Sequence, residues 1–107
     1  MAAVELRRPY PSDLLDDARG LPDAPGVYIF HGDDAGGTPL YVGKSVHVRT
    51  RVLSHLRNPR EASMLRQARH VRCRLTGGEV GALLLESRLI KQLQPRYNRR
   101  LRARSQL

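Results

Sequence analysis

Tryptophan is absent from this chain, and phenylalanine and cysteine occur once each. The single cysteine, Cys73, excludes an intramolecular disulfide, and we interpret it as a small core residue rather than a nucleophile. The four histidines are scattered and lack the spacing of a zinc site. No apolar run approaches the roughly 20 residues that a membrane helix needs, and the N-terminus lacks the apolar stretch of a signal peptide. These absences favour one small domain in a reducing, cytoplasmic compartment.

Acidic residues are also scarce, with ten Asp and Glu against nineteen Lys and Arg, which gives a formal net charge of +9. Most of the cations are arginines, whose planar guanidinium suits two-pronged contacts with phosphate. A basic balance can serve solubility alone. On a chain of 107 residues, however, this excess favours nucleic acid as the partner.

Proline, glycine and capping residues divide the chain into short elements. Residues 1–20 are expected to form an N-terminal arm with a short helix, and residues 21–107 the main domain with a basic tail. In chain order, periodicity predicts a helix over 12–18, strands over 26–31 and 39–43, a helix over 45–56, a second short helix over 59–69, a strand over 70–76 and a helix over 79–93. Ser45 is expected to cap the first long helix, and Asn58 the one after it.

The first two strands form a predicted hairpin that carries one tyrosine on each strand. In the second strand Leu40 and Val42 are expected to point inward and Tyr41 outward, and alternation places Tyr28 of the first strand on the same outer side. One interpretation is a cross-strand aromatic pair that only stabilises the hairpin. The other is a pair of functional hydroxyls on one face of the sheet.

The helix over 45–56 has a buried stripe and a basic side. Val48, Val52 and Leu56 repeat every four residues and are expected to face the core. Arg51 and His55 are also four residues apart, so their side chains share one face. That face is either a solvated basic surface or part of a site.

The last helix carries a carboxylate where an apolar residue is expected. Glu86 has Ala82 four residues before it and Leu89 three residues after it, so it lies on the apolar face. Burying an unpartnered carboxylate is costly, so such a residue is usually bound to a metal or paired with an arginine. A metal site and a buried ion pair with Arg51 are both open at this point.

The third strand and the C-terminal tail are basic. Val71, Cys73 and Leu75 alternate with Arg72 and Arg74, which predicts a half-buried strand with a basic outer face. The tail over 99–104 has four arginines and is typical of a segment that follows phosphates. The candidate DNA contacts are Lys44, Arg49, Arg72, Arg74, Arg99 and Arg100.

Five separated motifs occur in a characteristic order: Gly26-Val27-Tyr28, Tyr41-Val42-Gly43-Lys44, Arg51, Glu86 and Tyr97-Asn98. With these motifs the chain resembles the GIY-YIG endonuclease family. The longer segments over 40–45, 51–56, 81–86 and 94–98 are most similar to excision-repair nucleases of the UvrC and Cho type. The resemblance covers about residues 21–104.

The resemblance implies an α+β fold with a small central antiparallel three-stranded sheet flanked by helices. It implies a metal-dependent endonuclease that hydrolyses a DNA phosphodiester with one divalent ion, Mg²⁺ or Mn²⁺. Glu86 becomes the sole protein ligand of that ion. The implied catalytic residues are Tyr28 and Tyr41 around the attacking water, Lys44 beside them, Arg51 on the scissile phosphate, His55, and Asn98 ordering the site.

The resemblance also implies a biological role. It points to the 3′ incision at a lesion in nucleotide excision repair and to the SOS response of bacteria. Damaged duplex DNA is then the substrate, and a UvrB-like damage-recognition protein is a partner through regions that this sequence lacks. The end at Leu107, just after the last motif, suggests a shortened form of a longer protein.

His55 departs from the excision-repair pattern, which has a further tyrosine at this place, although some members of the family have histidine. Two alternatives to a repair nuclease stay open: a catalytically silent DNA-binding module of the same fold, and a GIY-YIG nuclease of a restriction or mobile-element pathway.

Overall fold

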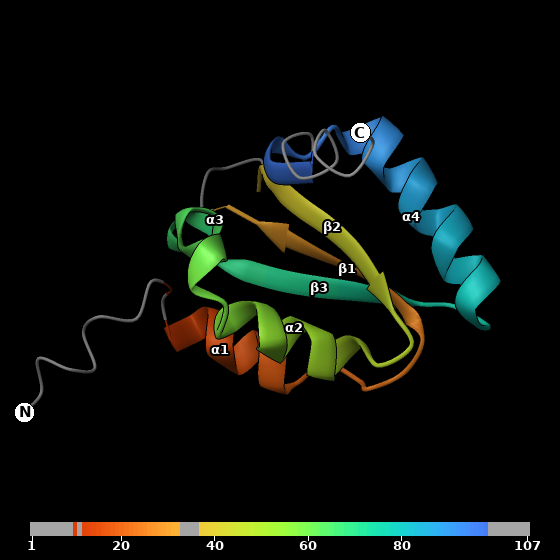
Figure 1. Cartoon of the computed structure of the whole chain (residues 1–107), viewed down its shortest axis with the longest axis horizontal. Coiled ribbons are helices and arrows are strands. Elements are labelled where there is room, and N and C mark those ends of the chain that lie inside the picture. The colour runs from red at the N-terminus through yellow and green to blue at the C-terminus, as the bar shows by residue number, and fades with distance from the viewer. Residues whose placement is uncertain (1–9, 11, 33–36, 99–107) are drawn as a thin grey trace, which may run out of the picture.

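The computed structural model describes residues 10, 12–32 and 37–98, and its centre is an antiparallel sheet. The strands are β1 (Gly26–His31), β2 (Pro39–Ser45) and β3 (His70–Leu75), in the order β2-β1-β3 (Figure 1). β1 is rich in β-branched and aromatic residues, and five of its six residues are buried, which suits the central position. The expected three-stranded sheet flanked by helices is confirmed.

Helices cover both faces of this sheet. α1 (Ser12–Arg19) and α2 (Val48–Leu56) lie on one face, and α4 (Glu79–Leu93) lies on the other (Figure 1). A short 3₁₀ turn, η2 (Pro59–Glu61), leads into α3 (Ala62–Gln67). The predicted boundaries of the last helix agree with α4.

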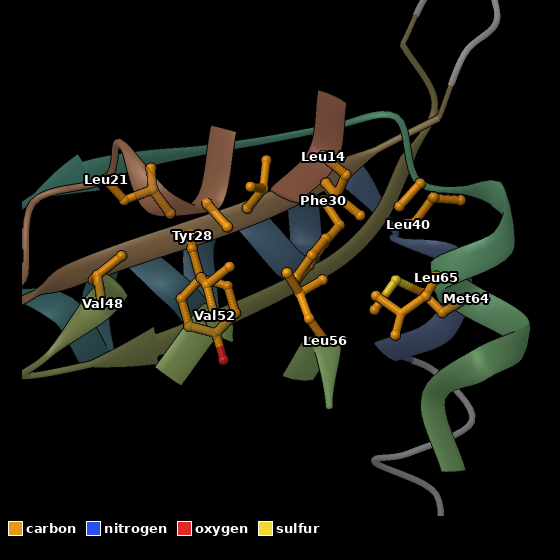
Figure 2. Close-up of a cluster of buried hydrophobic side chains, with 13 residues drawn as sticks. Leu14, Leu21, Tyr28, Phe30, Leu40, Val48, Val52, Leu56, Met64 and Leu65 are labelled. Carbon is orange, nitrogen blue, oxygen red and sulfur yellow. The ribbon is translucent and has the colours of Figure 1, made fainter. Parts of the chain in front are cut away.

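The sheet therefore separates two apolar clusters, where the sequence predicted one buried face. The smaller cluster joins Val27, Ile29 and Val42 of the sheet to Ala82 and Leu89 of α4. The larger cluster lies between the opposite face and α1, α2 and α3 (Figure 2). Its buried members are Leu14, Ala18, Leu21, Tyr28, Phe30, Leu40, Val48, Val52, Leu56, Met64, Leu65, Ala68 and Val71.

Two positions in the hairpin differ from the prediction. Tyr28 is only 2% exposed, so the side of the sheet expected to face outward is the larger core. Leu40 lies in this larger cluster with Tyr28, not with Val42. The reason is a bulge: Phe30 pairs with Tyr41 and His31 with Pro39, so Leu40 is an extra residue that alternation along an unbroken strand does not anticipate.

The starts of two helices also differ from the prediction. Ser45 belongs to β2, and its Oγ accepts a hydrogen bond from the backbone N–H of His47, which occupies the N-cap of α2. Asn58 caps a helical start as expected, since its Oδ1 accepts from the N–H of Arg60 at 3.0 Å. The single helix expected over 59–69 is, however, divided into η2 and the shorter α3.

β3 is buried at one end and open at the other. Val71 is buried and Cys73 is half-buried against the larger core, where burial raises the pKa of its thiol. This supports its interpretation as a packing residue. Leu75, expected on the inner face, is 53% exposed, because it pairs with Gly26 at the end of the sheet, where the neighbouring strand has no side chain to pack against it.

Candidate active site

The hairpin brings Tyr28 against Gly43, its partner across the two strands. A Cβ atom at residue 43 would overlap the Tyr28 hydroxyl and would lie 2.9 Å from Cε1 of the ring. Only glycine leaves room for the tyrosine to lie flat over β2 at this point. Gly43 of the second motif is therefore needed for Tyr28 of the first motif to pack in this position.

Three rings meet on this side of the sheet. The hydroxyl of Tyr28 lies 2.7 Å from Nε2 of His55. The centroid of the Tyr41 ring is 6.4 Å from that of Tyr28 and 5.3 Å from that of His55. The structure thus brings together the two tyrosines of the hairpin, which alternation placed on one side, and the histidine of α2, which only the resemblance placed in the same site.

The other ring nitrogen of His55 contacts a residue for which the sequence predicted no more than a place in the short helix over 59–69. Nδ1 lies 2.6 Å from Oε1 of Glu61, and Oε2 of Glu61 accepts a hydrogen bond of 3.1 Å from Nδ2 of Asn58. Glu61 follows His55 by six residues across the turn between α2 and α3. No helical or strand periodicity connects residues at that spacing.

Charged groups from three elements act on Tyr28. Burial raises the pKa of its hydroxyl far above the usual value, and Tyr41 raises it further. Arg51 lowers this pKa, while Glu61 and Glu86 raise it. The phenol is therefore neutral at physiological pH in the free protein, and Arg51 is the cation that opposes the effect of burial.

An open cleft of about 370 Å³ lies where the end of β2, the start of α2 and the first turns of α4 come together. Its lining residues are Lys44, Ser45, Val46, Arg51, Glu79, Val80, Ala82 and Leu83. Lys44 and Arg51, both exposed, give it two cations. Glu79, which the sequence analysis did not single out, precedes Glu86 by seven residues on α4 and so lies on a similar side of the helix.

Glu86 is 8% exposed and lies on the face of α4 that packs against the sheet, with Ala82 and Leu89. Within the described ranges, no three His, Cys, Asp or Glu side chains gather into a metal site. A metal here would rely on one carboxylate. That donor set fits Mg²⁺, which prefers oxygen ligands and keeps several waters.

Asn98 reaches the site only through the backbone of β2. Its Oδ1 accepts from the N–H of Val42 at 2.7 Å, and its Nδ2 donates to the carbonyl of Val42 at 2.9 Å. Asn98 is 3% exposed. It therefore holds the edge strand at the residue between Tyr41 and Gly43.

The candidate DNA contacts are dispersed. Arg49 is exposed on α2, with Nη1 at 3.5 Å from the carbonyl of Leu21. Arg72 and Arg74 are exposed on β3, opposite Ile29 and Val27 of β1. Two further candidates, Arg99 and Arg100, lie outside the described residues.

Comparison with known proteins decides the family. Residues 24–99 match the UvrC-like GIY-YIG domain. The chain belongs to this family. It is a GIY-YIG endonuclease domain, as the resemblance implied.

Relatives of this GIY-YIG domain include excinuclease Cho and the UvrABC system protein C. It is 57% identical to excinuclease Cho of Escherichia coli K12 over 98 residues, which are 92% of this chain and 33% of the relative. It is 44% identical to the UvrABC system protein C of Desulforudis audaxviator over 86 residues, 78% of this chain and 14% of that protein. The chain thus spans about a third of the length of the Cho protein that it matches.

A solved structure has the same fold. The N-terminal GIY-YIG endonuclease domain of UvrC from Thermotoga maritima, bound to its catalytic magnesium, superimposes with a TM-score of 0.69 at 29% identity, covering 78% of this chain and 92% of that one. Variants of that domain with tyrosine replaced by phenylalanine, or asparagine by alanine, are also bound to the catalytic divalent cation.

In the described part of our GIY-YIG domain, no helix is long and apolar enough to cross a membrane.

Proposed function

We propose that this GIY-YIG domain cuts DNA by hydrolysing one phosphodiester bond with the help of a divalent cation, Mg²⁺ or Mn²⁺. One observation supports this most directly. The Tyr28 hydroxyl is within hydrogen-bonding distance of His55 and within the electrostatic influence of Arg51 and Glu86. A proton acceptor, a cation and a carboxylate from two helices therefore act on one oxygen atom of the central strand.

Glu86 would hold the cation. Its carboxylate is a hard oxygen donor on an otherwise apolar helix face, and leaving most ligand positions to water and phosphate oxygens suits Mg²⁺. When bound, the ion supplies Lewis-acid stabilisation of charge on the phosphate and the leaving oxygen.

The remaining groups position the reactants. Tyr28 and Tyr41 orient the attacking water, and Arg51 donates to the non-bridging oxygens on which negative charge develops. Lys44, which shares the cleft with Arg51, adds positive charge next to the phosphate. Asn98 acts through β2 by holding the backbone beside Tyr41 and not by touching the substrate.

We further propose that the natural substrate is a damaged DNA duplex and that the cut is the 3′ incision of nucleotide excision repair, in the bacterial cytoplasm. The excinuclease relatives support this. The exposed cations Lys44, Arg49, Arg72 and Arg74 would follow phosphates, with Arg99 and Arg100 of the tail. A UvrB-like protein would be a partner of the longer protein.

Nicking of supercoiled plasmid by the 107-residue chain tests the activity. We expect open-circular product with Mg²⁺ or Mn²⁺ and none with a chelator or with Glu86→Gln. Binding without nicking in either metal would instead identify a silent DNA-binding module. An end-labelled duplex with one lesion tests the finer proposal, because cuts on the 5′ side, or equal cutting of undamaged duplex, contradict it.

A further inference from the structure

A chain of hydrogen bonds runs from the turn after α2 to the Tyr28 hydroxyl. Nδ2 of Asn58 donates to Oε2 of Glu61 at 3.1 Å, and Oε1 of Glu61 is 2.6 Å from Nδ1 of His55. Nε2 of His55 is 2.7 Å from the oxygen of Tyr28. Glu61 and His55, in the middle of this series, each have a partner on both sides.

The carboxylate of Glu61 determines which atom donates in each hydrogen bond of this series. An ionised carboxylate only accepts hydrogen bonds, so a contact with Glu61 requires a proton on Nδ1 of His55. In a neutral imidazole Nε2 then has a free lone pair, and its partner must donate. The donor is the Tyr28 hydroxyl.

We propose that Glu61 is a positioning residue: it fixes His55 in the tautomer with the proton on Nδ1, so that Nε2 accepts the proton of the Tyr28 hydroxyl and the Tyr28 oxygen can accept from the attacking water. This inference rests on the proposed nuclease function and adds to it a residue that lies outside the family motifs.

The surroundings of Glu61 suit such a role. The side chain of His55 is 11% exposed and that of Glu61 is 16% exposed, so water competes little for their contact. Asn58 is fixed by its own bond to the N–H of Arg60, and it holds the second oxygen of Glu61. The same residue therefore caps η2 and orients the carboxylate.

The ring of His55 has little freedom to turn over. Its centroid is 5.4 Å from the ring of Tyr28, 5.7 Å from that of Phe30 and 5.3 Å from that of Tyr41. Turning the ring would break both hydrogen bonds inside this aromatic cage. Tautomer and orientation are therefore set together.

The proton then has a defined path in the reaction. As the water oxygen forms its bond to phosphorus, the water proton passes to the Tyr28 oxygen and the Tyr28 proton passes to Nε2 of His55. The bond from phosphorus to the leaving oxygen breaks, and that oxygen takes a proton from solvent. The imidazolium stands next to the Glu61 carboxylate, with Tyr41 and Phe30 against its ring, and later returns its proton to solvent.

Spectroscopy tests this assignment without any need for cleavage. Long-range ¹H–¹⁵N correlations of the ¹⁵N-labelled chain should show a protonated Nδ1 and an unprotonated Nε2 for His55. Glu61→Ala should lose this pattern. A protonated Nε2 in the wild type, or an unchanged pattern in Glu61→Ala, overturns the proposal.

The chain also contains a matched control. Oδ2 of Asp17 lies 3.2 Å from Nδ1 of His70, a second carboxylate–imidazole pair, at the opposite end of β3 from Leu75. Within the described residues this pair is not hydrogen-bonded to a tyrosine. Asp17→Asn should alter the signals of His70 and leave both those of His55 and the cleavage rate unchanged.

Single-turnover nicking of supercoiled plasmid adds the functional readout. Glu61→Gln and Glu61→Ala should slow cleavage about tenfold to a hundredfold, by analogy with the loss of carboxylates that orient metal-binding imidazoles. DNA affinity should stay unchanged, and Glu61→Asp, which keeps the charge, should recover part of the rate. Wild-type rates in both Glu61→Gln and Glu61→Ala overturn the proposal.

Failure of the proposed function gives a different result. If the wild type and Asp17→Asn both fail to cut with either metal, the nuclease assignment is wrong. The spectra alone then decide the role of Glu61. If the pattern of protonated Nδ1 and unprotonated Nε2 is lost in Glu61→Ala, the positioning role is supported; if the pattern is retained, the positioning role is overturned. Circular dichroism and the signals of His31 and His47 report whether a variant is folded.

Discussion

Replacing Asn98 by alanine tests whether this motif residue acts on the substrate or on the fold. The side chain satisfies both the N–H and the carbonyl of Val42, a residue with no exposed surface on the edge strand β2. Leaving a buried polar group without a partner costs roughly 1–3 kcal/mol. Two such groups, with some water entry into the space left by the amide, give a loss of about 2–4 kcal/mol.

Such a loss is a large part of the total stability of a small domain, about 5–15 kcal/mol. It corresponds to a fall in melting temperature of about 10–25 °C. Thermal and urea unfolding should show this fall in Asn98→Ala and no recovery in Asn98→Asp, which keeps the acceptor for the Val42 N–H but buries a carboxylate oxygen against the Val42 carbonyl. Gln92→Ala removes an exposed amide and serves as the control. A variant that melts like the wild type but no longer cuts DNA would show that Asn98 meets the substrate, and our reasoning would be refuted.

Three further predictions follow from the site. Glu86→Gln should abolish cleavage and cation binding, measured by titration calorimetry, while it changes melting little; a much lower melting temperature with unaltered metal titration would identify Glu86 as a structural partner instead. Arg51→Ala and Arg51→Lys should both lose ~10²- to 10³-fold in single-turnover rate with nearly constant DNA affinity, because lysine keeps the charge but not the two-pronged geometry; Arg57→Ala, which removes an exposed arginine at the C-cap of α2, should cut normally. DNA affinity should fall steeply with salt and depend little on sequence, and Arg72→Ala or Arg74→Ala should each reduce the salt slope by about one; tight sequence-specific binding at high salt would contradict this.

Local periodicity was sufficient for much of the site. Strand alternation placed Tyr28 and Tyr41 on one side of the sheet, and the spacing around Glu86 placed a carboxylate on the buried face of the last helix, as the structure has it. The stripe of Val48, Val52 and Leu56 also faces the core. Within each strand or helix these features depend on neighbours at most four residues apart, where helix and strand geometry fix the relation between side chains.

Contacts between distant segments could not be predicted in the same way. The bond from Asn98 to Val42 joins residues 56 apart, and it depends on how the chain returns to β2 after α4. The bulge at Leu40 is a feature of the pairing between β1 and β2, which strand propensity does not specify. The contact between Glu61 and His55 also follows no helical period, because α2 ends at Leu56 and Glu61 belongs to the separate turn η2.

The histidine at position 55 gives a physical reason why a carboxylate at position 61 matters in this chain. A tyrosine, which the excision-repair pattern has at this position, offers one oxygen that both donates and accepts, so rotation of a single O–H bond suits it to its neighbour. A histidine has two different nitrogens, and its hydrogen bond to the Tyr28 hydroxyl has the required direction in only one tautomer. The carboxylate of Glu61 selects that tautomer, and Asn58 holds the carboxylate in place. Histidine in place of tyrosine at position 55 is therefore compatible with the role proposed for Tyr28, because the turn after α2 supplies the carboxylate of Glu61 that the imidazole needs.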